Sequence, residues 1–121
     1  EDFGRAAKIS RMGIGARSRF MIGEIEFQKK QYTAAISTFR KVMYGYGGDK
    51  AIDEIKPWQA VAGFEAGRCA ETQITTAKAQ ARTALIANAK MFYSFVVGKH
   101  PSSEYAAKAK LRLADLAKID N

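Results

Sequence analysis

One combination of small and aromatic residues occurs in both halves of this chain. It consists of a glycine in one helical segment, then an alanine in the next, an aromatic residue four positions later and a valine three positions after that. The members are Gly23, Ala35, Phe39 and Val42 in the first half, and Gly67, Ala89, Tyr93 and Val96 in the second. Because a glycine inside a helix costs about 1 kcal/mol relative to alanine, its recurrence indicates two helix crossings too close for a Cβ. We expect the alanine to face the glycine from the partner helix.

Apolar residues recur at helical spacing along most of the chain, and no segment shows the alternation of a strand. The expected helices cover residues 17–30, 35–43, 58–70, 85–97 and 105–118. Pro57 and Pro101 stand where new helical segments begin, and Ser102 or Ser103 is expected to cap the last helix. A further helix break is expected near residues 73–76. The pattern therefore predicts an all-α fold.

Length and composition are those of one domain. The chain has 121 residues, of which 47% are hydrophobic, and this is enough for a core of its own. A single cysteine excludes an intramolecular disulfide framework. No apolar run approaches the roughly 20 residues that a transmembrane helix needs. The first residues are neither a signal peptide nor an initiator methionine, so we expect residues 1–121 to be a mature form or one domain of a longer protein.

Few residues suited to catalysis or metal binding are present. The only histidine, His100, precedes a proline in a predicted turn, and the sequence supplies no further ligands beside it. Cys69 belongs to a small apolar helix face, which predicts a buried packing thiol, with a redox or intermolecular role as the alternative. Gly13 and Gly15 lack the spacing and lysine of a phosphate-binding loop, so they predict a helix break or tight turn. We expect no enzyme, no cofactor and no metal site.

The chain is strongly basic, because 20 lysine and arginine residues against 12 acidic ones give a net charge of +8. Residues 71–112 hold seven of these cations and only two acidic residues. Such a surplus favours anionic partners. Nucleic-acid binding also uses exposed aromatic residues, whereas Phe92, Tyr93 and Tyr105 occupy positions expected in a helical core. We therefore expect a solvated basic face or one that meets an acidic protein or membrane surface, with nucleic acid as the less favoured partner.

These patterns resemble the tetratricopeptide repeat, a helix pair of 34 residues with small residues at the crossing. The resemblance covers roughly residues 16–116. The run 20–46 is similar to the subgroup found in bacterial envelope proteins, of the Tol-Pal accessory and outer-membrane assembly lipoprotein types. The matching stretches are Ile22-Gly23-Glu24, Tyr32-Thr33-Ala34-Ala35-Ile36 and Phe39-Arg40-Lys41-Val42, and the ending 96–106 also resembles that subgroup.

The resemblance implies an all-α solenoid of stacked antiparallel helix hairpins. Its parts would be a first hairpin at residues 16–48, an elongated second hairpin at 57–98 and a C-terminal helix at 102–118. The second unit departs from the repeat, because 22 positions separate Gly67 from Ala89 whereas 12 separate Gly23 from Ala35. About ten residues are thus inserted, and we expect them to lengthen both helices by a turn or more.

In such arrays the first helix of each pair lines a concave groove that holds a peptide segment. By position, the resemblance nominates Arg17, Phe20, Glu24 and Gln28 from the first pair, and Phe64, Arg68 and Glu71 from the second. Arginines would bind carboxylates or carbonyls, and phenylalanines would supply apolar contact. The alternative is that Phe20 and Phe64 simply pack between helices.

The repeat and the scarcity of catalytic groups together predict a non-enzymatic scaffold or adaptor that binds a protein or peptide segment. The resemblance implies a bacterial periplasm or cell envelope, with the cytoplasm as the alternative. Two other functions stay open at this point: a basic domain that binds nucleic acid, and a self-assembly module that forms homo-oligomers.

Overall fold

The computed structural model describes residues 2–119, and every regular element within them is helical. The α-helices are α1 (Asp2–Gln28), α2 (Tyr32–Tyr44), α3 (Lys56–Ile74), α4 (Ala79–Lys99) and α5 (Glu104–Lys118). A short 3₁₀ helix, η1 (Gly48–Lys50), lies in the connection between α2 and α3. The prediction of an all-α fold is therefore confirmed.

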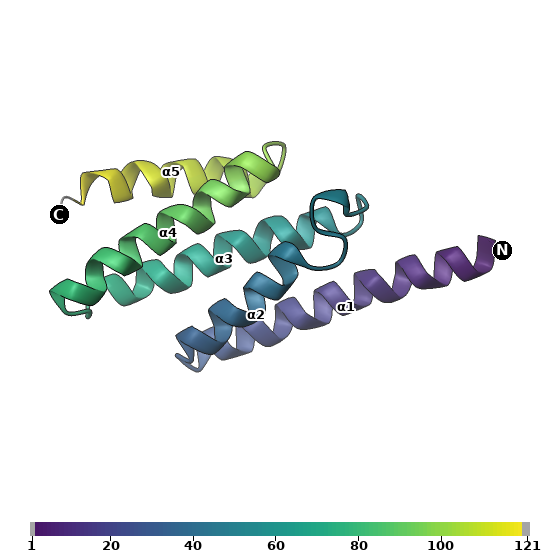
Figure 1. Cartoon of the computed structure of the whole chain (residues 1–121), viewed down its shortest axis with the longest axis horizontal. Helices are drawn as coiled ribbons and strands as arrows, with labels where there is room; N and C mark the ends of the chain where they lie inside the picture. The colour runs from purple at the N-terminus through teal and green to yellow at the C-terminus, as the bar shows by residue number, and fades with distance from the viewer. Residues whose placement is uncertain (1, 120–121) are drawn as a thin grey trace.

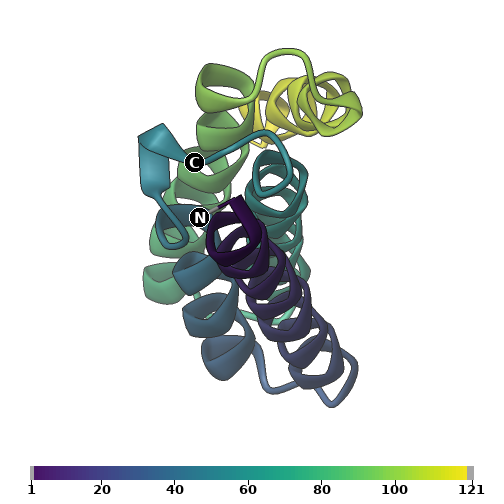
Figure 2. The ribbon, with the colours of Figure 1, turned by 90° about the vertical axis from the view of Figure 1, so that its right-hand side faces the viewer.

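Each α-helix packs against the next one along the chain (Figure 1). Seen from the end of the molecule, α1, α3 and α5 form one layer, and α2 and α4 form the other (Figure 2). α3 lies in the middle of the first layer, where it contacts both α1 and α5. This arrangement brings residues from three helices that are far apart in the sequence onto one side of the molecule.

At each of the two predicted helix crossings, an aromatic ring packs against the glycine. A Cβ on Gly23 would lie 2.5 Å from Cε1 of Phe39, and a Cβ on Gly67 would lie 2.6 Å from Cε1 of Tyr93. No side-chain carbon fits at such distances, so both crossings require glycine unless the rings move. The prediction of two close crossings is confirmed. The nearest side chain is the aromatic ring, however, and not the fully buried alanine of the pattern.

α1 begins at Asp2 and not near residue 17, and it continues through Gly13 and Gly15. The predicted helix break at these glycines is therefore wrong. Each glycine costs only about 1 kcal/mol, and the arginine, alanine and methionine residues around them are strong helix formers. Tyr46 also holds this part of α1, because its hydroxyl donates a 3.2 Å hydrogen bond to the carbonyl oxygen of Gly15 and accepts one of 3.1 Å from Nε of Arg19.

The extra residues of the second helix pair lie mostly in α4. Ala89 is the eleventh residue of α4, whereas Ala35 is the fourth residue of α2. α3 continues from Gly67 to its end at Ile74, which is only slightly further than α1 continues from Gly23 to its end at Gln28. The insertion therefore lengthens α4 by about two turns, and the prediction that both helices would gain a turn or more is wrong for α3.

The helix starts follow the expected local signals. Pro57 lies in the first turn of α3, where its missing N–H leaves no hydrogen bond unmade. Oγ of Ser103 accepts a 3.1 Å hydrogen bond from the backbone N–H of Tyr105, so Ser103 and not Ser102 caps α5. α3 ends at Ile74, inside the predicted break at residues 73–76.

The hydrophobic core lies between the two layers. Its largest fully buried side chains include Phe39, Met43, Phe92, Tyr93, Val96 and Leu116. Cys69 is also fully buried, as its position among small residues of α3 predicts. Burial raises the pKa of the Cys69 thiol to about 12, so the thiol is protonated at neutral pH and is a packing group.

Candidate functional site

Two adjacent hollows are lined by side chains of α1, α3 and α5. The larger, between α3 and α5, has a volume of about 650 Å³, and the smaller, between α1 and α3, has a volume of about 320 Å³. Glu65 and Tyr105 line both, so the two hollows meet at these side chains. We refer to the two hollows together as the groove.

Five of the seven nominated residues line this groove. Phe20 and Glu24 line the smaller hollow, and Phe64, Arg68 and Glu71 line the larger one. They meet there because Phe20 and Glu24 are one helical turn apart on α1, as are Phe64, Arg68 and Glu71 at spacings of four and three on α3. The residues that the resemblance nominated thus lie on the faces of α1 and α3 that line the two hollows.

Arg17 and Gln28 lie outside the groove. Both side chains are exposed on α1, and neither lines either hollow. Phe20 and Glu24 are the residues of α1 that line the smaller hollow. Both Arg17 and Gln28 lie at helical spacing from Glu24, so they share its side of α1 without lining the hollows, and their role in binding stays a prediction.

The two phenylalanines differ in what they offer to a ligand. Phe20 is only 8% exposed, and its ring packs against Phe39 and Trp58 at centroid distances of 5.6 and 5.7 Å. Most of the Phe20 side chain therefore packs between helices, as the alternative prediction for this residue says. Phe64 is half-buried between Tyr93 and Tyr105, at centroid distances of 5.5 and 5.4 Å, and still lines the larger hollow.

A cluster of one arginine and two glutamates joins the two hollows. Nη1 of Arg68 donates hydrogen bonds of 2.7 and 2.9 Å to the two carboxylate oxygens of Glu65, whose side chain is only 8% exposed. The guanidinium group of Arg68 also lies over the ring of Phe27, 5.2 Å from its centroid. Burial, and next the negative charge of Glu65, raise the pKa of Glu24 to about 7. The groove thus contains a carboxyl group that titrates near neutrality.

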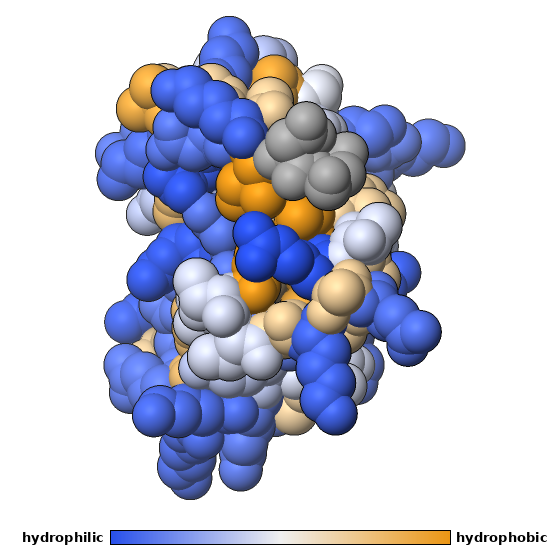
Figure 3. Space-filling model, turned by 90° about the vertical axis from the view of Figure 1, so that its left-hand side faces the viewer, coloured by the Kyte–Doolittle hydropathy of each residue, from blue (hydrophilic) through white to orange (hydrophobic). Residues whose placement is uncertain are grey.

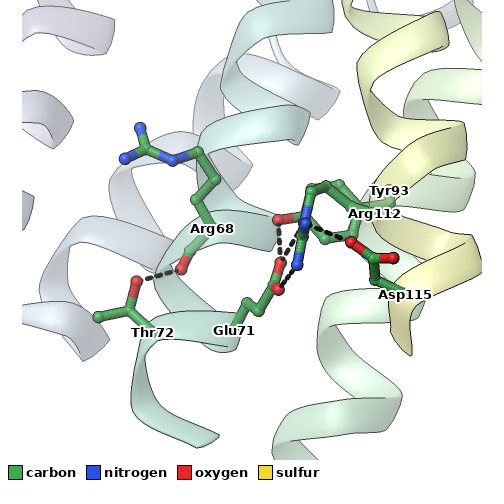
Figure 4. A network of polar contacts seen from close by, with 6 residues as sticks. All are labelled: Arg68, Glu71, Thr72, Tyr93, Arg112 and Asp115. Carbon is green, nitrogen blue, oxygen red and sulfur yellow. Dashed lines mark hydrogen bonds and ion pairs between the residues drawn. The ribbon is translucent and has the colours of Figure 1, made fainter. Parts of the chain in front are cut away.

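Glu71 is held in a network that links α3, α4 and α5 (Figure 4). One carboxylate oxygen accepts a 2.8 Å hydrogen bond from the hydroxyl of Tyr93 and a 3.1 Å bond from Nε of Arg112. The other oxygen pairs with Nη2 of Arg112, and Nη1 of Arg112 donates a 2.7 Å bond to Asp115. Glu71 therefore stabilises the fold, and its oxygens are already engaged at the edge of the groove.

The sequence reasoning missed the α5 side of the groove. Tyr105, Lys108 and Arg112 line it, and Nζ of Lys108 lies 5.0 Å from the centroid of the Tyr105 ring. It also missed Glu65, although a carboxylate three residues before Arg68 on a helix is a recognisable ion-pair signal. The lysine and arginine spacing on α5 indicated only a basic face, and nothing in that spacing located it opposite α3.

His100 follows α4 directly, at the start of the connection to α5, and does not line either hollow of the groove. Its ring packs edge-on against Phe95 at a centroid distance of 5.5 Å, and it lines a third hollow of about 520 Å³ together with Lys56 and Lys99. This hollow meets the smaller hollow of the groove at Pro57 and Tyr105. Burial, and next the charge of Lys56, lower the pKa of His100. Among the residues that the structure describes, no group of three or more histidine, cysteine, aspartate or glutamate side chains is placed to hold a metal ion.

Hydrophilic side chains cover most of the end of the molecule drawn in Figure 3, with smaller hydrophobic areas between them. None of the helices between residues 2 and 119 combines the length and the hydrophobicity that crossing a bilayer requires. Comparisons with protein-family models, with curated proteins and with solved structures find no match to this chain.

Proposed function

We propose that this protein is a non-enzymatic interaction module that holds a peptide or protein segment in the groove. The observation that carries the proposal is the pair of hollows that meet at Glu65 and Tyr105, because their walls come from three helices of one layer. A groove of this kind offers aromatic side chains for apolar contact and charged side chains for orientation, as peptide-binding grooves do.

The finer description follows from the sequence resemblance. We propose that α1 with α2 and α3 with α4 are tetratricopeptide-like hairpins of a solenoid, with α5 stacked on the second. The close contacts of Gly23 with Phe39 and of Gly67 with Tyr93 support this, because the same device recurs in both pairs. We also propose that the protein works in a bacterial periplasm or cell envelope, on the similarity of residues 20–46 to that subgroup.

A lysine of the groove that forms no ion pair with the described side chains suggests the chemistry of the ligand. Glu65 is paired with Arg68, and Glu71 with Arg112. Lys108 lines the groove and contacts the Tyr105 ring, and it forms no ion pair with any side chain that the structure describes. A peptide with an acidic side chain opposite Lys108 and an apolar one at Phe64 and Tyr105 would use both kinds of contact.

Peptides selected from a random library against the full chain test this proposal. Lys108→Glu should weaken the binding of the selected peptides by about tenfold, equivalent to about 1.4 kcal/mol. The matched control is Lys110→Glu, which makes the same charge change on the exposed side of α5 outside the groove and should leave the affinity unchanged. Hydrogen exchange should show protection by bound peptide in α1, α3 and α5.

Two results would contradict the proposal. Equal weakening by Lys108→Glu and Lys110→Glu would mean that the peptides respond to net charge alone. Failure to select any peptide, together with tight and salt-dependent binding of RNA or DNA, would favour the nucleic-acid alternative that the charge of +8 suggests.

A further inference from the structure

α1 carries a row of exposed apolar side chains on the face turned away from the other helices. Ile14 is 62% exposed, and Met21 and Ile25 are each 50% exposed. At about 100° per residue, these three lie within about 40° of one another around the helix axis. The opposite side of α1 carries the buried Ala16 and Gly23. Exposed apolar side chains aligned on one helix face mark an interaction site more often than scattered ones do.

The spacing of this row is that of a helix–helix contact. Ile14, Ser18, Met21 and Ile25 follow one another at intervals of four, three and four residues, which are the d and a positions of consecutive heptads. We call these four residues the α1 seam. Ile22, which is 52% exposed, lies at the e position beside the seam, so the exposed apolar face of α1 extends over about 100°. The polar Ser18 stands at an a position within this face, where helix pairs tolerate single polar residues.

Basic side chains border the α1 seam. Arg17 occupies a flanking g position, Lys29 follows the last residue of α1, and Arg11 lies at the N-terminal end of the seam. All three are exposed, and none forms an ion pair with a side chain whose placement the structure gives. Glu24, the acidic residue on the same flank, lines the groove. The open charge beside the seam is therefore positive.

We propose that the α1 seam binds one amphipathic helix of another protein, with aliphatic side chains along its own seam and acidic side chains beside them. Aliphatic residues would cover Ile14, Met21 and Ile25, and carboxylates would meet Arg17 and Lys29. A second copy of this chain fits less well, because two α1 seams would bring the same basic flanks together. None of the four seam residues lines the groove, and the two surfaces adjoin at Glu24.

Two designed peptides test the proposal against the full chain. Both have four heptads with isoleucine at a and leucine at d; one has glutamate at every e and g position, and the other has lysine there. By fluorescence anisotropy, the glutamate peptide should bind at micromolar concentration, and the lysine peptide should not. Met21→Asp should weaken binding at least about tenfold, because it places a charge in the centre of the seam. Arg17→Glu combined with Lys29→Glu should reverse the preference between the two peptides.

Control variants separate the seam from other sites. Arg40→Glu reverses one exposed charge on α2 and should leave the affinity unchanged. Lys108→Glu in the groove should also leave it unchanged, which distinguishes this site from the one in the proposed function. Far-UV circular dichroism verifies that each variant is folded, as expected because every changed side chain is exposed.

The proposal is overturned if the glutamate peptide fails to bind, if both peptides bind equally, or if Met21→Asp has no effect. Cosedimentation with phosphatidylglycerol vesicles that depends on Met21, without peptide binding, would assign the seam to a membrane surface instead. Sedimentation velocity that shows a dimer lost in Met21→Asp, again without peptide binding, would assign it to a second copy of the chain.

Discussion

The ring of Phe39 lies directly over the backbone of Gly23, and the ring of Tyr93 lies over Gly67 in the same way. The nearest ring carbons would be 2.5 and 2.6 Å from a Cβ on the respective glycine. Each glycine weakens its helix by about 1 kcal/mol in intrinsic propensity. The close approach that it permits brings a large aromatic side chain fully into the core.

Alanine substitutions test this relationship. Gly23→Ala and Gly67→Ala should each lower the free energy of unfolding by about 1–3 kcal/mol, because the ring must move and the loss exceeds the gain in helix propensity. The matched control is Gly13→Ala in α1, where nothing lies within 4 Å of the added Cβ. Gly13→Ala should raise the free energy of unfolding by about 0.5–1 kcal/mol. Urea denaturation measures all three, and equal effects at Gly13 and Gly23 would contradict the crossing.

The helices were predictable from the sequence where apolar spacing is strong. The resemblance also nominated residues on the faces of α1 and α3 that line the groove. The N-terminal half of α1 was missed, because Gly13 and Gly15 favour a break and only the surrounding helix formers oppose it. Apolar spacing describes one helix at a time, so it could not show that Tyr105 and Lys108 of α5 lie opposite α3.

Contacts between side chains far apart in the sequence could not be predicted either. Glu71 and Arg112 are 41 positions apart, and their contact depends on how α5 docks against α3. The nomination of Glu71 as a binding residue followed from its place on the correct face of α3. Because α4 and α5 pack beside this face of α3, Tyr93 and Arg112 bind the carboxylate of Glu71.

The network around Glu71 should contribute to stability. Arg112→Ala should lower the free energy of unfolding by about 1–3 kcal/mol, because the carboxylate loses its charged partner. Tyr93→Phe should cost about 1 kcal/mol. A double-mutant cycle should give a coupling energy of about 0.5 kcal/mol or more, since both donors bind the same carboxylate oxygen. Arg82→Ala, at an exposed position of α4, is the control and should change stability by less than about 0.5 kcal/mol.

The cap of α5 gives a paired comparison of adjacent serines. Ser103→Ala should lower the free energy of unfolding by about 1 kcal/mol, because it removes the acceptor for the backbone N–H of Tyr105. Ser102→Ala should have little effect, since Ser102 is exposed and does not cap the helix. Thermal denaturation of the two variants checks the assignment, and an effect at Ser102 equal to that at Ser103 would contradict it.

The carboxyl group of Glu24 should make stability depend on pH. Burial beside Glu65 raises its pKa from 4.5 to about 7, so the folded chain holds a proton that the unfolded chain releases between these values. The contribution of Glu24 to the free energy of unfolding should therefore fall as pH rises from 4.5 to about 7, and level off above that. Solvent screening at this partly exposed position limits the change to about 1 kcal/mol.

Glu24→Gln isolates this effect, because it keeps the shape of the side chain and removes the titration. Urea denaturation below and above the window should show the variant gaining stability relative to the wild type as pH rises. His100 contributes the opposite slope, since its lowered pKa favours the unfolded chain in acid, but it is present in both proteins and cancels in the difference. A pH-independent difference between the two proteins would show that Glu24 is ionised at neutral pH, and that the groove carries a full negative charge beside Glu65.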